Sequence, residues 1–214
     1  MPHTISSYHD LVRTDALAML VGCAGTVLDF GGGVGASSAS LKDAGRAEKI
    51  VLMDQVAETA LQAVDHAIAL DLNNAAQVKA ALAQSGPFDT VLCLDVLEHL
   101  VDPWAVIAQL EGALRPGGTM IVSLPNASHH SVLLPLIFRG RFDYQDAGIM
   151  DRTHLRWFTK ATSIELASSG ALQLEVVEPN LSGRRDQWLN RMTWGLLERF
   201  FAKQYRLKLS KLGS

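Results

Sequence analysis

Short, uninterrupted runs of Val, Leu and Ile alternate with segments of helical periodicity along the first 125 residues. The apolar runs at 26–30, 49–53, 67–70, 88–94 and 119–124 predict five strands. The segments at 36–44, 56–64, 73–83 and 104–114 predict the helices between them, and residues 7–21 predict a lead-in helix that ends near Gly22. Because these strands are apolar throughout rather than at alternate positions, we expect a parallel sheet buried between helices.

The pattern changes after residue 125. Residues 126–158 show little periodicity apart from a short apolar helix at 130–138. A helix is predicted at 159–169, a strand at 172–178, a helix at 187–201 and a last strand around Tyr205, Leu207 and Leu209. The two late strands predict an antiparallel pair that closes one edge of the sheet. A tight turn is expected at 115–118, where Pro and Gly precede the fifth strand.

Composition excludes several classes of protein. Of 214 residues, 48% are hydrophobic and 19% are charged, and the net charge is −3. A disordered chain is excluded, and nucleic acid is not expected as a partner. The two cysteines, Cys23 and Cys93, are predicted to be reduced and buried in a cytoplasmic protein. Leu20–Cys23 resembles a lipoprotein cleavage box, but it lacks a positive leader with a long apolar run, and no segment has the length of a membrane span.

Polar side chains stand where each predicted strand ends. They are Asp29, Asp54, Asp71, Asp95 and Asn126. Ligands of an open parallel sheet bind at the carboxyl ends of its strands, so these positions predict the binding site. Gly31, Gly33 and Gly35 form the turn after the first strand, where glycine allows close approach of a ligand.

The glycine turn is open to three interpretations. It could simply pack a helix on a strand. Gly31, Gly33 and Ala36, followed by Asp54, also satisfy the dinucleotide fingerprint. Asp29, however, would repel a pyrophosphate and attract an ammonium group. With Asp54 for ribose hydroxyls and Asp71 for an adenine amine, S-adenosylmethionine explains the set best.

Four motifs carry a resemblance. They are VLDFGGGVG at 27–35, VLMD at 51–54, FDTVLCLDVLEHL at 88–100 and LRPGGTMIVSLPN at 114–126. Together they resemble the class I S-adenosylmethionine-dependent methyltransferases over residues 8–178. Gly32 departs from the family pattern, in which many members carry cysteine or another small residue, and this difference does not change the expected cofactor. The insert NASHHSVLLPLIFRGRFDYQDAGIMDRTHLRWFT at 126–159 looks like a bacterial branch linked to cell-surface polysaccharide biosynthesis.

The resemblance implies a Rossmann-like α/β fold: seven strands, mostly parallel, with helices on both faces and an antiparallel C-terminal strand. It implies one domain over 1–214. This comprises an N-terminal helix at 7–21, a cofactor-binding core at 26–125, an acceptor-side insert at 126–158, and a C-terminal helix and strands at 159–211.

The resemblance also implies the cofactor contacts. Around the methionyl part it places Asp29, Gly31, Gly33 and Gly35, and beneath the sulfur end it places Asp95 to Glu98. Asp54 would bind the ribose and Met53 or Gln55 would flank the adenine. Asp71 and Leu72 would face the adenine ring.

The acceptor side should supply a base if a hydroxyl is methylated. His154 is the preferred candidate and His99 the second, although His99 could instead cap a helix. Arg152, Arg156, Tyr144 and Asn126 are predicted to bind the acceptor. The alternative for the arginines is an ion pair with Asp151 that locks the insert closed.

Two further features have competing interpretations. His129 and His130 could bind a metal with Asp151, but neighbouring side chains usually diverge, so no metal is expected. Residues 184–211 hold eight basic and two acidic residues interleaved with Trp188, Trp194, Phe200 and Phe201. This pattern fits either peripheral contact with a membrane or lipid-linked substrate, or a helix packed on the sheet edge with a solvated basic face, which we favour.

The predicted function is S-adenosylmethionine-dependent methylation, at oxygen, of a small-molecule or glycan-type acceptor. One alternative is an O-methyltransferase like those of quinone biosynthesis. Another is a non-catalytic cofactor-binding partner that resembles the methionine-biosynthesis protein W family. The insert of that family lacks the motif GIMDRTHLR, which argues against this alternative.

Overall fold

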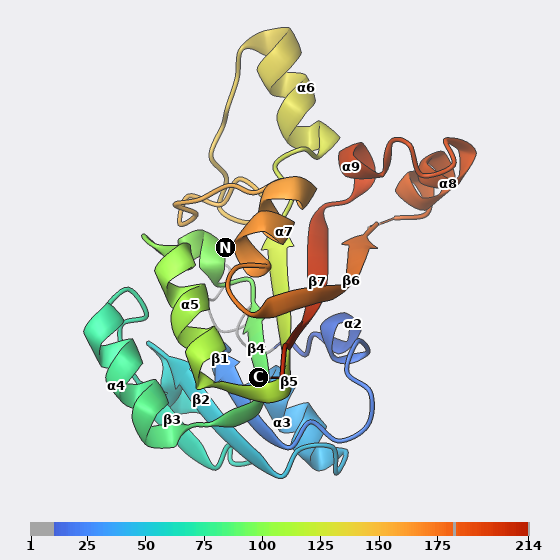
Figure 1. The fold of residues 1–214 in the computed structure, drawn as a ribbon. Coiled ribbons are helices and arrows are strands. Elements are labelled where there is room, and N and C mark those ends of the chain that lie inside the picture. The colour runs from blue at the N-terminus through green and yellow to red at the C-terminus, as the bar shows by residue number, and fades with distance from the viewer. Residues whose placement is uncertain (1–10, 182, 214) are drawn as a thin grey trace.

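A seven-stranded sheet forms the centre of the computed structural model, which describes residues 11–181 and 183–213 (Figure 1). Its strand order is β3-β2-β1-β4-β5-β7-β6. Neighbouring strands are parallel except at β7, which runs antiparallel to both β5 and β6. The predicted fold class is thus confirmed. The strands are β1 (Thr26–Phe30), β2 (Lys49–Asp54), β3 (His66–Ala69), β4 (Phe88–Leu94), β5 (Leu114–Pro125), β6 (Leu172–Asn180) and β7 (Gln204–Lys211).

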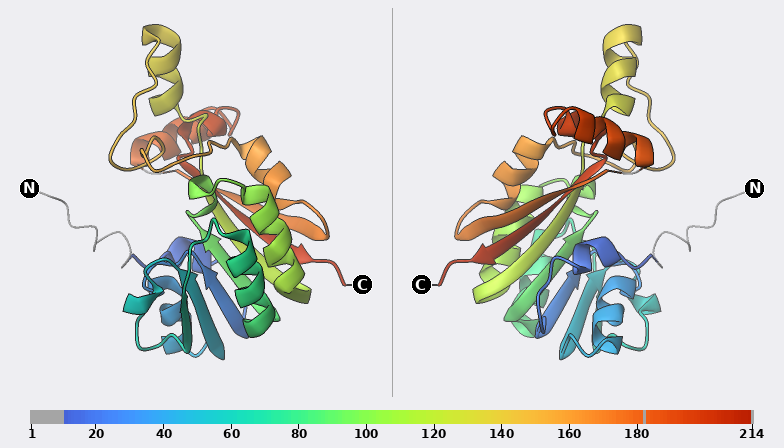
Figure 2. Two further views of the ribbon diagram at one scale, coloured as in Figure 1. Left: turned by 90° about the vertical axis from the view of Figure 1, so that its left-hand side faces the viewer. Right: turned by 90° about the vertical axis from the view of Figure 1, so that its right-hand side faces the viewer.

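Helices cover both faces of the sheet, as the two side views in Figure 2 show. On one face, α2 (Thr14–Leu17) and α3 (Ala36–Asp43) bury a core that includes Leu17, Leu41 and Ile50. On the other face, α4 (Ala75–Ser85), α5 (Pro103–Ala113) and α7 (Lys160–Ala167) pack over a larger core around Phe30 and Ile107. Successive strand residues point to opposite faces, so strands covered on both sides must be apolar at every position.

Local side-chain caps set where three helices begin. Asn74 accepts a hydrogen bond from the amide of Gln77 at the start of α4. Asp102 caps α5, which has Pro103 in its first turn. Thr159 and Thr162 form a capping box at the start of α7. These caps satisfy amides that have no partner inside the helix, which is why the sequence predicted these starts.

Three predicted helices are wrong in extent. Residues 56–64 contain only the 3₁₀ turn η1 (Ala57–Thr59), because Leu61 donates its amide to Val34 in the glycine turn. The predicted 7–21 helix starts outside the described residues, and within them α2 ends at Leu17. The predicted 187–201 helix is divided into α8 (Arg184–Met192) and α9 (Glu198–Phe201), since Trp194 and Gly195 between them have positive φ.

Other local predictions also changed. Residues 115–118, predicted as a turn, belong to β5. They shift the register between β4 and β5: Phe88 pairs with Leu114, but Thr90 pairs with Thr119. Cys93 is buried as predicted, whereas Cys23 is exposed. No helix among residues 11–181 and 183–213 has the length and apolar character needed to cross a membrane.

The helix predicted at 130–138 is present as α6 (His130–Arg139). It projects from the body of the molecule beyond the end of β5, with α8 and α9 to one side (Figure 1). Ile137 and Phe138 of α6 are exposed. The projecting elements therefore lie on the carboxyl side of the sheet, where the candidate site residues gather.

Candidate active site

Strand register brings the predicted polar residues to one edge of the sheet. Phe30 pairs with Met53, Asp54 with Ala69, and Leu94 with Ser123. The strands thus end at nearly the same level, and the segments that follow them share that edge. The site expected from strand ends alone is a single region in space.

The glycine turn after β1 needs glycine for two different reasons. Gly31 and Gly35 have φ of +73° and +83°, where a side chain is strained. A Cβ on Gly31 would also lie 2.3 Å from Cγ2 of Val96, which follows β4. At Gly32 a Cβ would lie 2.3 Å from Cγ of Asp29. Glycine at position 32 therefore makes room for the Asp29 carboxylate, a requirement that the sequence did not reveal.

Asp29 is buried at the end of β1 and receives a 2.6 Å hydrogen bond from the hydroxyl of Ser38 in α3. Burial raises the pKa of Asp29 to about 6, and the hydrogen bonds from Ser38 only partly oppose this rise. A positively charged group beside this carboxylate would stabilise its ionised form.

Asp54 and Asp71 organise the loops beside them. Asp54 accepts the amides of Gly33 at 2.8 Å and Val56 at 2.9 Å. Asp71 accepts the amide of Asn73 at 2.9 Å, and the Gln55 side chain lies 3.4 Å from it. Leu72 is buried in the core next to this loop.

These groups fit the cofactor that the sequence predicts. From Asp71 through Asp54 to Asp29, carboxylates stand in a row along the strand ends. The row leads to a turn whose glycines permit close approach. An adenosine with hydroxyl and amine donors at one end and a positive charge at the other matches this order. A pyrophosphate next to Asp29 would be repelled.

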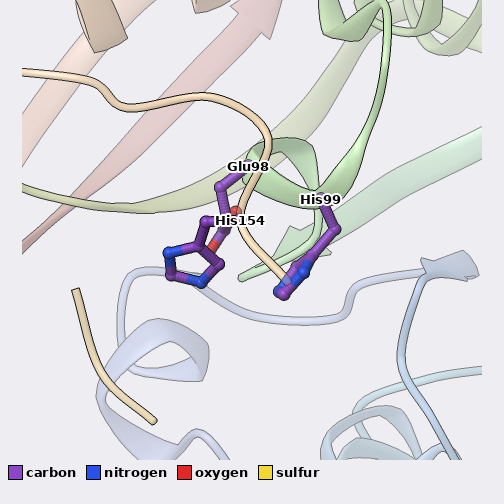
Figure 3. A group of neighbouring side chains, drawn as sticks. All are labelled: Glu98, His99 and His154. Atoms are coloured by element: carbon purple, nitrogen blue, oxygen red, sulfur yellow. The ribbon is translucent and has the colours of Figure 1, made fainter. Parts of the chain in front are cut away.

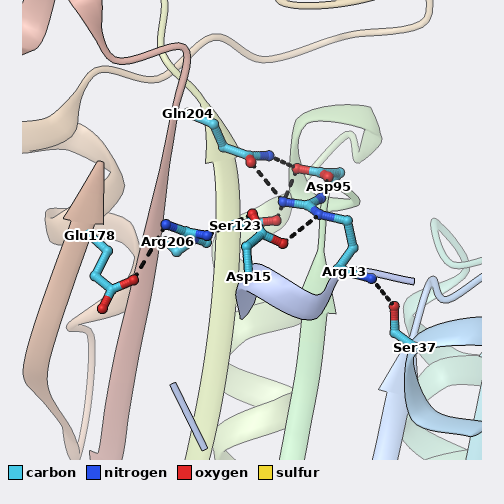
Figure 4. A network of polar contacts seen from close by, with 8 residues as sticks. All are labelled: Arg13, Asp15, Ser37, Asp95, Ser123, Glu178, Gln204 and Arg206. Carbon is cyan, nitrogen blue, oxygen red and sulfur yellow. Dashed lines mark hydrogen bonds and ion pairs between the residues drawn. The ribbon is translucent and has the colours of Figure 1, made fainter. Parts of the chain in front are cut away.

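Asp95 is held by contacts from three other segments of the chain. Its carboxylate forms an ion pair with Arg13 of the N-terminal segment and receives hydrogen bonds from Gln204 and Ser123 (Figure 4). Arg13 also bonds to Gln204 at 2.7 Å. Asp95 adopts a φ of 57°, which is uncommon outside glycine. The carboxylate predicted to lie beneath the sulfur is thus already paired with a cation, and sequence reasoning did not identify Arg13.

The insert forms a hollow of about 460 Å³ on the acceptor side. Its lining combines aromatic, cationic, imidazole and aliphatic groups: Tyr144, Arg152, His154, Leu155 and Trp157. Tyr144 and Trp157 pack together with ring centroids 5.9 Å apart. Arg152 is exposed and pairs with Asp146 at 2.7 Å. Three predicted acceptor-side residues, Tyr144, Arg152 and His154, therefore line one hollow.

Two other residues predicted to bind the acceptor have structural contacts instead. Asn126 is fully buried, donates to the carbonyls of Arg199 and Ala202, and accepts the amide of Ser128. Arg156 donates to the carbonyl of Val101 at 2.6 Å. Both use polar groups to tie segments of the chain together, and their contact with an acceptor stays a prediction.

The alternative prediction was an ion pair between Asp151 and Arg152 or Arg156 that holds the insert closed. It is wrong, because Arg152 pairs with Asp146 and Asp151 has other partners. Asp151 accepts the amide of Thr153 at 2.8 Å and the hydroxyl of the same residue. The insert is held instead by the backbone carbonyl of Glu98, which accepts the amides of Leu155 at 2.8 Å and Arg156 at 3.0 Å. Backbone contacts of this kind leave no residue pattern in a sequence.

These contacts bring His99 and His154 together. His99 follows β4 in the turn η2 (Leu97–His99), and the centroids of the two rings are 4.7 Å apart. Burial and the nearby His154 lower the pKa of His99. Glu98 is buried next to them, and burial raises its pKa to about 8. The resemblance implied that Glu98 lies with Asp95 beneath the sulfur end of the cofactor, but its meeting with His154 was not predicted.

The remaining predictions concern the projecting elements. His129 and His130 do not diverge, because their ring centroids lie 4.1 Å apart, and His129 caps α6 through the amide of Ser131. Trp188 and Trp194 are 59% and 93% exposed, so the favoured helix packed on the sheet edge is wrong.

Comparison with known proteins settles the family. A family model described as a methyltransferase domain matches residues 14–200. The chain belongs to the methyltransferase domain family. This membership confirms the predicted family.

Curated relatives match part of the chain. A ubiquinone biosynthesis O-methyltransferase of Xanthomonas campestris pv. campestris is 32% identical over 129 residues, which are 59% of this chain and 54% of that protein. A tRNA 5-carboxymethoxyuridine methyltransferase of Escherichia coli is 35% identical over 130 residues, 58% of this chain and 48% of that protein. The chain thus spans about half the length of these curated relatives.

Solved structures share the fold. An S-adenosylmethionine-dependent methyltransferase from Archaeoglobus fulgidus has a TM-score of 0.61 at 16% identity, covering 92% of this chain and 90% of that one. The N-methyltransferase NodS of Bradyrhizobium japonicum, solved with S-adenosyl-L-homocysteine, has a TM-score of 0.57 at 14% identity. That match covers 96% of this chain and 86% of NodS.

Proposed function

We propose that this protein methylates a hydroxyl group of a small-molecule or glycan-type acceptor held in the hollow of the insert. The observation that carries the proposal is the lining of that hollow by Tyr144, Arg152, His154 and Trp157. Flat aromatic faces with an arginine suit a ring or sugar that bears hydroxyl, carboxylate or phosphate groups. The resemblance of the insert to the polysaccharide-linked bacterial branch supports a glycan among these acceptors.

The cofactor is proposed to occupy the edge between Asp71 and Asp29. Asp54 and Asp71 would hold its ribose and adenine, and the glycine turn its methionyl part. The cofactor supplies an activated methyl group, so the protein mainly has to align the acceptor and exclude water. His154 lines the hollow and His99 packs against it, with ring centroids 4.7 Å apart. These two are the residues proposed to act on the acceptor hydroxyl.

Methyl-labelled S-adenosylmethionine tests the proposal against a panel of acceptors. The panel holds nucleotide sugars, lipid-linked glycans, catechols and unmodified tRNA. We expect a methyl ether on a sugar or phenol. Transfer only to tRNA, whose modification gives the Escherichia coli relative its name, would overturn the proposal. Tight binding of NAD in calorimetry would contradict the cofactor.

A quinone-type phenol is the second candidate acceptor. Relatives of this chain include ubiquinone biosynthesis O-methyltransferases, one of them, from Paraburkholderia xenovorans, 30% identical over 164 residues. The projecting elements expose large apolar side chains: Leu134, Leu136, Ile137 and Phe138 on α6, and Trp188, Met192, Trp194 and Leu196 on or after α8. Such a surface suits an acceptor that carries a lipid tail.

Peripheral contact with a membrane belongs to the same proposal. Arg184, Arg185 and Arg191 of α8 add basic charge beside the exposed tryptophans. Basic and aromatic side chains together are typical of surfaces that bind anionic lipid. Sedimentation with anionic vesicles should capture the protein. The variant Trp188→Ser with Trp194→Ser should stay in solution, while neutral vesicles serve as the control.

The non-catalytic alternative predicts a different outcome. A cofactor-binding partner would bury residues 151–156 in an interface with another protein, whereas here Arg152 and His154 line a hollow. If calorimetry shows cofactor binding and no acceptor class is methylated, the non-catalytic alternative replaces the proposal.

A further inference from the structure

Three groups that commonly bind metals converge beside the hollow. Glu98 and His99 come from the turn η2 after β4, and His154 comes from the insert (Figure 3). One carboxylate oxygen and one nitrogen from each ring lie within 4.8 Å of one another. Ligand atoms around one divalent ion are roughly 3 to 3.5 Å apart, given bonds of about 2.0–2.2 Å. Small side-chain rotations would therefore bring these three atoms to the spacing of ligands around one ion.

Glu98 carries the strongest sign of a missing ligand. Its side chain is 2% exposed, and its Oε2 atom has no hydrogen-bond partner in the described residues. A buried carboxyl oxygen without a partner costs free energy, and native proteins nearly always satisfy such groups. A cation next to Glu98 would satisfy it.

Both histidines are oriented as metal ligands usually are. Nδ1 of His99 lies 3.2 Å from the carbonyl oxygen of Thr153, and Nδ1 of His154 lies 3.0 Å from that of Ile149. A carbonyl can only accept, so each Nδ1 carries the proton and each Nε2 keeps its lone pair. Hydrogen bonds from the distal nitrogen to a carbonyl are the common support for a metal-bound imidazole.

A second cluster in the protein lacks this arrangement. His129, His130 and Asp186 also place donor atoms within 4.8 Å. Nδ1 of His129, however, accepts the amide of Ser131 at 3.2 Å. The hydroxyl of Ser131 lies 2.7 Å from the same nitrogen and can donate or accept, so no carbonyl holds the proton on Nδ1 as it does in His99 and His154. This cluster serves as an internal control.

We propose that Glu98, His99 and His154 bind one divalent metal ion of the Mn²⁺, Co²⁺ or Zn²⁺ type, with open positions toward the hollow. Two imidazoles and one carboxylate leave room for an acceptor oxygen on such an ion. The proposal rests on the proposed function for its role in methyl transfer. It assigns the two histidines to the ion, in place of a general base, and replaces the expectation of a metal-free site.

The ion would act on the acceptor hydroxyl. Bound to the cation, the hydroxyl becomes more acidic and gives its proton to water. Its oxygen forms the bond to the methyl carbon, and the carbon–sulfur bond breaks with the electron pair left on sulfur. The products are a methyl ether, a neutral thioether and one proton, so charge and atoms balance.

Metal binding is tested directly, without cofactor or acceptor. The chelator-treated full chain is titrated with Co²⁺, followed by visible absorption and by metal analysis after dialysis. We expect one Co²⁺ per chain for wild type and for the control His130→Ala. We expect binding at least ~100-fold weaker for Glu98→Gln and His99→Ala, which each remove a ligand. Thermal melting and calorimetry with S-adenosylmethionine show whether each variant is folded.

The outcomes separate the two proposals. No stoichiometric Co²⁺ in wild type, or loss of Co²⁺ in His130→Ala with retention in Glu98→Gln, overturns the metal site. Full methyl transfer in excess EDTA overturns the role of the ion. Stoichiometric binding without methylation of any acceptor leaves the metal site in place and contradicts the proposed function instead.

Discussion

Ser38 donates its hydroxyl to the buried carboxylate of Asp29 over 2.6 Å. This bond joins the first helix after the glycine turn to the end of β1, yet burial still raises the pKa of Asp29 to about 6. The ordinary value is 3.8, so the folded state holds a proton that the unfolded state has lost at pH 5. The resulting stabilisation is complete below about pH 4 and disappears as the pH rises through 6.

The variant Asp29→Asn should remove this pH dependence. Between pH 4 and pH 7, wild type should lose on the order of 3 kcal/mol of unfolding free energy relative to the variant. Urea denaturation of the cofactor-free protein at several pH values measures the difference. The exposed Asp43→Asn is the control, and curves for Asp29→Asn that stay parallel to wild type would contradict the shift.

Gly32→Ala should weaken cofactor binding strongly. The new Cβ would lie 2.3 Å from Cγ of Asp29, so the carboxylate or the turn must move. Overpacking of this kind typically costs about 1–3 kcal/mol, which corresponds to roughly 5- to 150-fold in affinity when the binding loop is displaced. Gly112→Ala is the matched control, because nothing lies within 4 Å of a Cβ at that position in α5. Equal affinities for the two variants would refute the steric explanation.

Arg13→Ala should destabilise the fold. The ion pair with Asp95 is largely buried, with side-chain exposures of 15% and 14%. Removing the guanidinium leaves a buried carboxylate without its cation, at a cost of about 3 kcal/mol. Arg141→Ala breaks the exposed pair with Asp143 and should leave the melting temperature unchanged. A variant Arg13→Ala with wild-type melting would show that the pair contributes nothing to stability.

Arg152 and Arg156 should respond differently to substitution by glutamine. Arg152 lines the hollow and is exposed, so its loss should raise KM for the acceptor without lowering thermal stability. Arg156 donates to the carbonyl of Val101, so its loss should free the insert and lower the melting temperature. Acceptor kinetics and melting curves check both. The reverse pattern would mean that Arg156 binds the acceptor.

Much of the fold could be predicted because its signals are local. The strands at 26–30 and 88–94 begin and end as their apolar runs do, and Asn74 and Asp102 cap the helices they precede. Residues 56–64 mark the limit of that approach. Their helical periodicity is real, but one hydrogen bond from Leu61 to Val34 holds the segment in another conformation.

The candidate site likewise has a part that the sequence predicts and a part that it does not. The row of carboxylates from Asp29 to Asp71 could be predicted, because parallel strands bring their ends to one edge whatever their separation along the chain. Asn126 also stands at a strand end, but its buried side chain already makes three hydrogen bonds within the protein. Residue type and position do not reveal which polar groups tertiary contacts have already satisfied.

By itself, the sequence determined the parallel sheet, its glycine turn and the order of polar groups along the strand ends, because short-range periodicity and turn chemistry specify them. Tertiary structure alone decided that Arg13 meets Asp95 and that His154 meets Glu98 and His99. These residues are brought together by hydrogen bonds and packing between segments distant in the chain. Such contacts depend on where whole elements lie, and no local pattern records them.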